Sequence, residues 1–168
     1  LNALSLAFLA VKENHGCAGV DGVTIEHYEG NLDLNLKIVQ RELVTHTYSP
    51  LPLLKILVDK GNGEARALCI PAVRDRIVQA AVLQFIEPIL EREFEECSFA
   101  YRKGRSVKQA VYMIKAYYEQ GYHWVVDADI DAFFDSVDHP RLLEKFKRYV
   151  RVPFIQTLIE LWLKTEIW

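Results

Sequence analysis

The sequence predicts an α+β protein that is mostly helical, with one β-hairpin and a separate acidic strand that forms part of a further sheet. Apolar residues recur every three or four positions in several segments, which indicates amphipathic helices. Two apolar runs on either side of a glycine-rich turn indicate the hairpin. A third extended apolar run carries aspartates at every second position. Helices and strands that are segregated along the chain are typical of the α+β class.

The composition describes one ordinary soluble domain with a real core. The chain has 168 residues, of which 51% are hydrophobic and 26% charged, and this excludes a disordered chain. The net charge is only −3, so any contact with phosphate must come from local clusters of cations. No apolar run approaches the roughly 20 residues of a membrane span, so no membrane partner is expected. Three widely spaced cysteines predict a reducing, cytoplasmic location.

Two packing helices are predicted in the first third of the chain. Residues 4–11 and 32–43 carry apolar side chains at the spacing of one helix face. Between them, residues 16–24 contain three glycines and an aspartate, which is the chemistry of tight turns. The second helix is expected to stop before Pro50.

The hairpin is predicted to consist of strands at residues 52–58 and 66–70, joined by a turn at residues 59–64. Lys60 precedes the turn glycines and Arg66 follows them, so two cations can be held at the tip of a loop that exposes its backbone. The alternative is an ordinary solvated hairpin, and the spacing alone does not separate the two.

A long helix is predicted over residues 74–87, with Pro88 stopping or kinking it. Arg74 and Arg76 lie in its first turn, where the helix dipole disfavours cations. Asp75 offsets this only in part. The arrangement therefore suggests an external anion near Arg74.

An acidic segment and then a basic loop follow the long helix. Residues 91–96 are predicted to be a solvated, acidic helix face. In residues 98–106, aromatic side chains alternate with Arg102, Lys103 and Arg105, which is the composition of a contact with the backbone and bases of a nucleic acid.

Three helices are predicted in the rest of the chain. Ser106 is expected to cap a helix over residues 107–120, Asp138 to cap one over residues 138–150, and Pro153 to open the last. The buried face of the first of these three is expected to consist of Val107, Ala110, Val111 and Ile114.

The acidic stretch WVVDADIDAFFDSVDH organises the rest of the chain. In an extended segment, Asp127, Asp129 and Asp131 project from one face, ~6.6 Å apart. At an effective dielectric of about 20, each adjacent pair repels by roughly 2 to 3 kcal/mol, so a cation is expected there. The alternative is a set of exposed strand-end carboxylates, with Asp135 and Asp138 forming turns and caps. Because apolar residues enclose Asp129 on both sides, it is favoured as a metal ligand.

Taken together, these motifs resemble the N-terminal part of bacterial group II intron-type reverse transcriptases. The resemblance implies the fingers of a right-hand polymerase and the start of its palm over residues 1–121, and a palm segment with the first catalytic aspartate over residues 122–168. The motifs that carry it are AGVDG, YSP, DKGNGEARALCIP, VRDRIVQAAV, SFAYRKGRS and DADIDAFFDSVDH.

The resemblance implies specific roles for residues near the reaction. Asp129 matches the first catalytic, metal-binding aspartate, and the backbone carbonyl of Ile130 would lie beside a second metal. Phe134 matches the aromatic residue under the incoming sugar, which favours deoxynucleotides. Lys60 and Arg66 match the fingertip cations that hold the triphosphate.

Further positions are implied to contact nucleic acid: Arg74, Arg102, Lys103 and Arg105. Two Mg²⁺ ions are implied in the complete active site, where a primer 3′-hydroxyl attacks the α-phosphate in line. The implied partners are an RNA template, a DNA primer and dNTPs. One aspartate cannot hold two metals, so these 168 residues alone are expected to be inactive.

Several departures from the family pattern point to a divergent or CRISPR-associated branch, and so to intron RNA or CRISPR adaptation proteins as further partners. Arg66 is followed by Ala67 where the family often has proline, and Asp131 stands where it often has a basic residue or glycine. Two alternatives to a polymerase remain: a non-catalytic RNA-binding or splicing-support (maturase) module, and a carboxylate-dependent metal nuclease.

Overall fold

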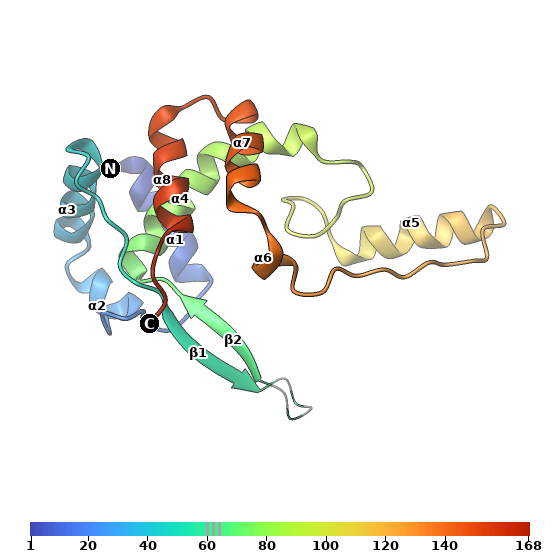
Figure 1. The fold of residues 1–168 in the computed structure, drawn as a ribbon, viewed down its shortest axis with the longest axis horizontal. Coiled ribbons are helices and arrows are strands. Elements are labelled where there is room, and N and C mark those ends of the chain that lie inside the picture. Colours follow the sequence, from blue (N-terminus) through green and yellow to red (C-terminus); the bar gives the residue numbers. More distant parts are fainter. Residues whose placement is uncertain (60, 62, 64) are drawn as a thin grey trace.

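The computed structural model describes residues 1–59, 61, 63 and 65–168. A body of helices carries two projections, a two-stranded hairpin and the long helix α5 (Figure 1). The fold class expected from the sequence is confirmed: the molecule is mostly helical, with a two-stranded antiparallel sheet. The elements are α1 (Asn2–Glu13), α2 (Ile25–Gly30), α3 (Leu32–Val44), β1 (Leu54–Asp59), β2 (Ala65–Ile70), α4 (Val73–Leu90), the 3₁₀ turn η1 (Glu91–Glu93), α5 (Val107–Glu119), α6 (Phe133–Ser136), α7 (His139–Tyr149) and α8 (Pro153–Leu163).

The core lies between α1, α3, α4 and α8. Phe8 of α1, Leu36 of α3 and Ile77 of α4 are almost completely buried in one apolar cluster. Val150, directly after α7, and Leu158 of α8 join the same cluster. The apolar faces predicted for these helices are therefore the faces that pack together.

Helix α4 is longer than predicted, because Pro88 does not stop it. The helix continues to Leu90 with the proline inside its last turn. A proline there removes a single backbone donor from a helix that ends two residues later, which limits the disruption. The acidic residues 91–96 were expected on a helix face, but only Glu91–Glu93 are helical, as the 3₁₀ turn η1.

Two short helices were not predicted. Helix α2 begins after Thr24, whose hydroxyl accepts a 3.2 Å hydrogen bond from the backbone N–H of His27. This threonine is a capping signal that was available in the sequence. Helix α6 is a single turn, and it follows Ala132, which has φ +46°.

The hairpin has the predicted antiparallel pairing, with Leu54 opposite Ile70 and Asp59 opposite Ala65. A second pairing at its base was not predicted. The N–H of Leu53 donates to the carbonyl of Glu166 at 2.8 Å, and the N–H of Trp168 donates to the carbonyl of Leu53 at 2.8 Å. Residues 166–168 thus run parallel to the start of the hairpin and join it to the end of α8.

Helix α5 forms as predicted, but its expected apolar face is not buried. Ser106 caps it through a hydrogen bond from the N–H of Gln109. Val107 is 80% exposed and Ile114 is 62% exposed. Periodicity identifies which face of a helix is apolar, whereas burial depends on which element covers that face.

The acidic segment was predicted to be a strand, and this expectation is wrong for the described residues. Residues 122–130 belong to no helix and no strand. A strand needs a neighbour for its ladder of hydrogen bonds, and Figure 1 shows this segment running back along α5 instead.

Candidate functional site

The acidic segment presents its carboxylates to solvent. Asp127, Asp129 and Asp131 are all exposed, and Ile130 between them is 64% exposed. The turn that enters the segment is held by edge-to-face aromatic pairs, with ring centroids 5.9 Å apart for Tyr117 and Tyr122. The segment is thus attached to α5 at its start and leaves the aspartates accessible.

Helix α6 follows directly and carries the predicted sugar-side aromatic residue. Phe134 is 81% exposed, and its ring meets the edge of Phe133 with centroids 5.3 Å apart. Ala132 adopts the left-handed conformation that redirects the chain from the extended segment into this helix. Asp129, Ile130 and Phe134 therefore lie in one short, exposed stretch.

The donor chemistry of this stretch suits a hard cation only in part. The carboxylate of Asp129 and the carbonyl of Ile130 are oxygen donors of the kind that Mg²⁺ prefers. Among the residues that the structure describes, however, no cluster of three or more His, Cys, Asp or Glu side chains could hold a metal ion. A metal ion at Asp129 would therefore need further ligands.

The hairpin places Arg66 next to its tip. Arg66 lies opposite Val58 in the ladder, and its side chain is exposed. The Asp59 carboxylate accepts a 2.8 Å hydrogen bond from the N–H of Gly61, which starts the turn. The predicted partner cation, Lys60, lies outside the described residues.

Arg74 has partners inside the protein. Its guanidinium forms an ion pair with Glu42 of α3, lies 3.5 Å from the Asp75 carboxylate and stacks over the ring of Tyr48 at 5.6 Å. Burial alone would lower the pKa of Arg74, but the hydrogen bond to Glu42 and the charge of Asp75 reverse this and raise it. The unfavourable cation at the start of α4 is thus compensated internally, and the expected external anion is not needed. A nucleic-acid contact for Arg74 stays a prediction.

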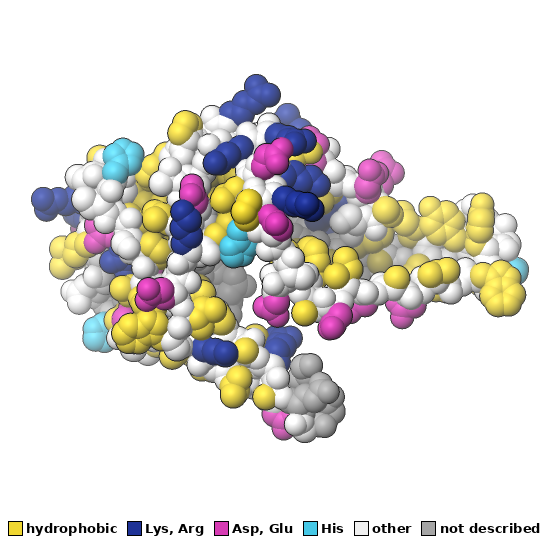
Figure 2. Space-filling view, in the orientation of Figure 1, with side chains coloured by type: hydrophobic (Ala, Val, Ile, Leu, Met, Phe, Trp, Pro, Cys, Tyr) yellow, Lys and Arg dark blue, Asp and Glu magenta, His cyan; other side chains and the backbone are white. Residues whose placement is uncertain are grey.

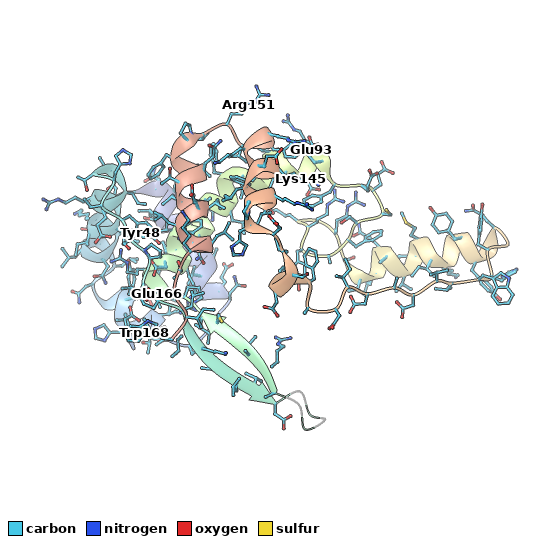
Figure 3. All side chains as sticks on the ribbon, in the orientation of Figure 1. Tyr48, Glu93, Lys145, Arg151, Glu166 and Trp168 are labelled. Carbon is cyan, nitrogen blue, oxygen red and sulfur yellow. The ribbon has the colours of Figure 1, made fainter. Side chains whose placement is uncertain are left out.

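Asp75 is the centre of a buried polar network that was not predicted. Its side chain is 1% exposed and accepts hydrogen bonds from the Tyr48 hydroxyl at 2.7 Å and from the Leu51 N–H at 2.9 Å. The indole N–H of Trp162 donates to the Tyr48 hydroxyl at 3.2 Å. The network therefore joins α4, the segment before β1, and α8. Figure 3 shows Tyr48 within this body of helices.

The three cations of the basic loop divide into two kinds. Arg102 is enclosed: its side chain is 5% exposed, it pairs with Glu91, and it donates to the carbonyls of Glu95 and Ser98. Lys103 is exposed, and Arg105 is partly exposed above the ring of Phe99. Arg102 therefore shapes the loop, whereas Lys103 and Arg105 remain accessible to a ligand.

The structure does not gather all the predicted site residues in one place. Asp129, Ile130 and Phe134 are together in one segment, and Arg66 is on the hairpin, which Figure 1 shows as a separate projection. Among the helices of the described residues, none is both long and apolar enough to cross a membrane.

Comparison with known protein families identifies the class of protein. A family model described as reverse transcriptase (RNA-dependent DNA polymerase) matches residues 58–167, which is more than half of the chain. The chain belongs to the reverse transcriptase family. The match includes the second hairpin strand β2, the basic loop and the acidic segment, so the resemblance based on sequence motifs is confirmed.

Similar proteins place this reverse transcriptase chain near the group II intron proteins. Protein YkfC of Escherichia coli is 37% identical over 145 residues, which are 84% of this chain and 38% of that protein. The group II intron-encoded protein LtrA of Lactococcus lactis is 32% identical over 139 residues, which are 82% of this chain and 23% of that protein. Nuclear intron maturase 2 of Arabidopsis thaliana is 33% identical over 94 residues, which are 56% of this chain and 13% of that protein.

A solved structure is also similar. A chain of a partial Cas6-RT-Cas1–Cas2 complex superposes with a TM-score of 0.58 at 28% identity, covering 99% of this chain and 27% of that chain. This reverse transcriptase chain thus spans less than two fifths of the length of these relatives.

Proposed function

We propose that this chain forms the fingers and first palm segment of an RNA-directed DNA polymerase. The enzyme extends a DNA primer on an RNA template with dNTPs. The observation that carries the proposal is an exposed Asp129, four residues before the start of α6, in a chain that belongs to the reverse transcriptase family.

In this proposal Asp129 and the carbonyl of Ile130 hold Mg²⁺, which would activate the attacking and leaving oxygens. The chain's own residues position the nucleotide. Arg66 at the hairpin tip neutralises triphosphate charge, with Lys60 beside it in sequence. Phe134, exposed on α6, occupies the space of a 2′-hydroxyl without offering it a hydrogen bond. Lys103 and Arg105 contact the template backbone.

The decisive experiment replaces Asp129 by Ala in the full-length protein and measures extension of an RNA-templated DNA primer. We expect synthesis to be lost while RNA affinity changes little, because Asp129 acts on the reacting phosphates. Asp127→Ala is the matched control, since it removes the same charge two positions away in the same exposed segment, and it should retain most of the activity. Near-normal synthesis by Asp129→Ala would refute the assignment.

The isolated 168 residues are proposed to be inactive in synthesis, because one carboxylate and one carbonyl cannot hold two Mg²⁺ ions. Extension of a primer by this piece, dependent on both Mg²⁺ and dNTPs, would contradict this.

The similarity to maturases favours a second candidate, an RNA-binding or splicing-support function in which intron RNA is the partner. The similarity to the chain in the Cas6-RT-Cas1–Cas2 complex favours CRISPR adaptation proteins as alternative partners. The Asp129→Ala protein separates catalysis from binding. If it retains full biological function in the host, the chain serves as a binding module and not as a polymerase.

A further inference from the structure

A short segment around α7 contains an unusual share of the positive charge. Residues 139–151 hold five of the chain's 20 Lys and Arg residues but only one of its 23 Asp and Glu residues. The whole chain has a net charge of −3, so this segment is locally basic in an acidic protein. Figure 2 shows Lys and Arg side chains gathered over α7 and over the loop between α7 and α8.

Three of these cations share one face of the helix. Arg141, Lys145 and Arg148 are at positions i, i+4 and i+7, and all three are exposed. Arg151 follows just beyond the end of α7 and is also exposed. We call these four residues the α7 basic face. From Arg141 to Arg148 the face extends ~10.5 Å along the helix, at 1.5 Å per residue.

The positions of these cations are not explained by helix stability alone. Cations in the last turn of a helix, such as Arg148, are favoured by its dipole. Arg141 is in the first turn, where the dipole disfavours it, and the carboxylate of the capping residue Asp138 accepts a 2.9 Å hydrogen bond from the backbone N–H of Arg141 and forms no ion pair with its guanidinium. Arg74 has the same conflict at the start of α4, but there Glu42 resolves it.

The α7 basic face is poorly neutralised by the protein itself. Within the part of the chain that the structure describes, Arg148 pairs with Glu144, and no carboxylate lies within ion-pair distance of Arg141, Lys145 or Arg151. The Arg148–Glu144 pair is exposed on both sides, at 69% and 68%, so it contributes little and can be replaced. Three cations are therefore available to an external anion.

We propose that the α7 basic face binds the phosphate backbone of duplex RNA without sequence readout. A row of cations on a rigid helix, reaching over ~10.5 Å, can contact successive phosphates of one strand. Arginine is suited to this role because its planar guanidinium contacts phosphate through two hydrogen bonds.

The α7 basic face begins at Arg141, seven residues after Phe134, and its binding of RNA does not depend on the proposed catalytic role of Asp129. Figure 3 shows Lys145 and Arg151 at the end of the molecule away from Trp168, which lies at the base of the hairpin. An RNA held here would be anchored away from the base of the hairpin, on the helix that follows the segment of Asp129 and Phe134.

The test uses the full-length protein with the triple variant Arg141→Gln, Lys145→Gln and Arg151→Gln. The probe is a fluorescent 20-base-pair RNA duplex, and binding is measured by anisotropy at several KCl concentrations. Loss of three phosphate contacts should weaken binding at least roughly tenfold and lower the slope of log affinity against log salt by about 2 to 3. The melting temperature verifies that the variant remains folded.

The control triple variant is Lys12→Gln, Lys37→Gln and Lys164→Gln. These lysines are exposed, each pairs with a carboxylate, and the variant removes the same total charge. It should bind the RNA duplex within about twofold of the unmodified protein. Equal losses in the two triple variants would overturn the proposal, because they would reflect net charge and not a site.

Two further probes, a DNA duplex and polyglutamate, distinguish a nucleic-acid ligand from an acidic protein. If the α7 triple variant loses affinity for a DNA duplex by the same factor as for the RNA duplex, the face recognises the phosphate backbone, as proposed. If the α7 triple variant loses binding to polyglutamate but not to RNA, the face binds acidic protein and the proposal is wrong.

Discussion

The hydroxyl of Tyr48 lies 2.7 Å from the carboxylate of Asp75, and both groups are buried between α4 and the segment that leads into β1. Asp75 also accepts from the N–H of Leu51, three residues before the hairpin begins. The carboxylate therefore joins the long central helix to the base of the fingertip hairpin. The network thus attaches the base of the hairpin that carries Arg66 to the body of helices.

The first prediction concerns the contribution of this network to stability. Tyr48→Phe removes the hydroxyl, which leaves the Trp162 N–H without an acceptor and one Asp75 oxygen without its short hydrogen bond, with only Arg74 at 3.5 Å from that oxygen. We expect a loss of ~1–3 kcal/mol in the free energy of unfolding, measured by urea denaturation. Tyr112→Phe on α5 is the control, because that tyrosine is 68% exposed, and it should change stability by less than about 0.5 kcal/mol.

The second prediction concerns pH. Burial raises the pKa of Asp75 above its usual 3.8, more strongly than the hydrogen bonds from Tyr48 and Leu51 and the charge of Arg74 lower it. A carboxyl group with a raised pKa in the folded state binds protons more tightly when folded, so its contribution to stability is greatest below its unfolded pKa and is lost as the pH rises through the folded pKa.

Relative to Asp75→Asn, which does not titrate, the unmodified chain should therefore lose unfolding free energy as the pH rises from about 4. Urea denaturation of both proteins between pH 4 and pH 7 measures the difference. An increase in the relative stability of the unmodified chain over this range would contradict the assignment.

The third prediction concerns the AGVDG loop, which packs on the start of α4. A Cβ atom at Gly19 would lie 2.5 Å from the Cα and 2.6 Å from the N of Ala72. Because these are backbone atoms, Gly19→Ala must displace the loop, at a cost of ~1–3 kcal/mol. Gly30→Ala is the matched control, since a Cβ there meets no atom within 4 Å. If thermal melts show equal stability for the two variants, the backbones of Gly19 and Ala72 do not lie this close together.

Much of the fold could be predicted because its signals are local. The stripe of Leu4, Phe8 and Val11, the capping by Ser106 and Asp138, and the glycines of the hairpin turn each act within a few residues, and the structure contains the corresponding elements.

The errors occurred where the outcome depends on residues distant in the chain. Whether α5 is buried and whether the acidic segment forms a strand depend on what lies against them. The contact between Trp162 and Tyr48 joins residues 114 positions apart, and no local pattern reports it. Arg74 was expected to need an external anion because Glu42 could not be placed beside it from the sequence. The site residues, by contrast, were predicted from family motifs and not from periodicity.

The fourth prediction tests the fingertip role of Arg66. In the full-length protein, Arg66→Ala should raise the KM for dNTPs at least roughly tenfold with a smaller change in kcat, because it removes a cation from the triphosphate. Lys55→Ala is the control, since Lys55 is an exposed cation near the base of the same hairpin, opposite Cys69. If both variants raise the KM for dNTPs equally, the effect comes from the total positive charge of the hairpin, and the proposed contact of Arg66 with the triphosphate is wrong.

The fifth prediction concerns selection of the sugar. Phe134 is 81% exposed and contributes little to the core, so Phe134→Val should leave the fold intact while it opens space for a 2′-hydroxyl. We expect the preference for deoxynucleotides over ribonucleotides, measured as a ratio of kcat/KM values, to fall at least roughly tenfold. Phe133→Val serves as the control, because its ring meets the edge of Phe134 without being the residue proposed to lie under the sugar. An unchanged ratio for Phe134→Val would mean that another side chain excludes the 2′-hydroxyl, whereas a loss confined to Phe134→Val would place the incoming nucleotide directly over α6.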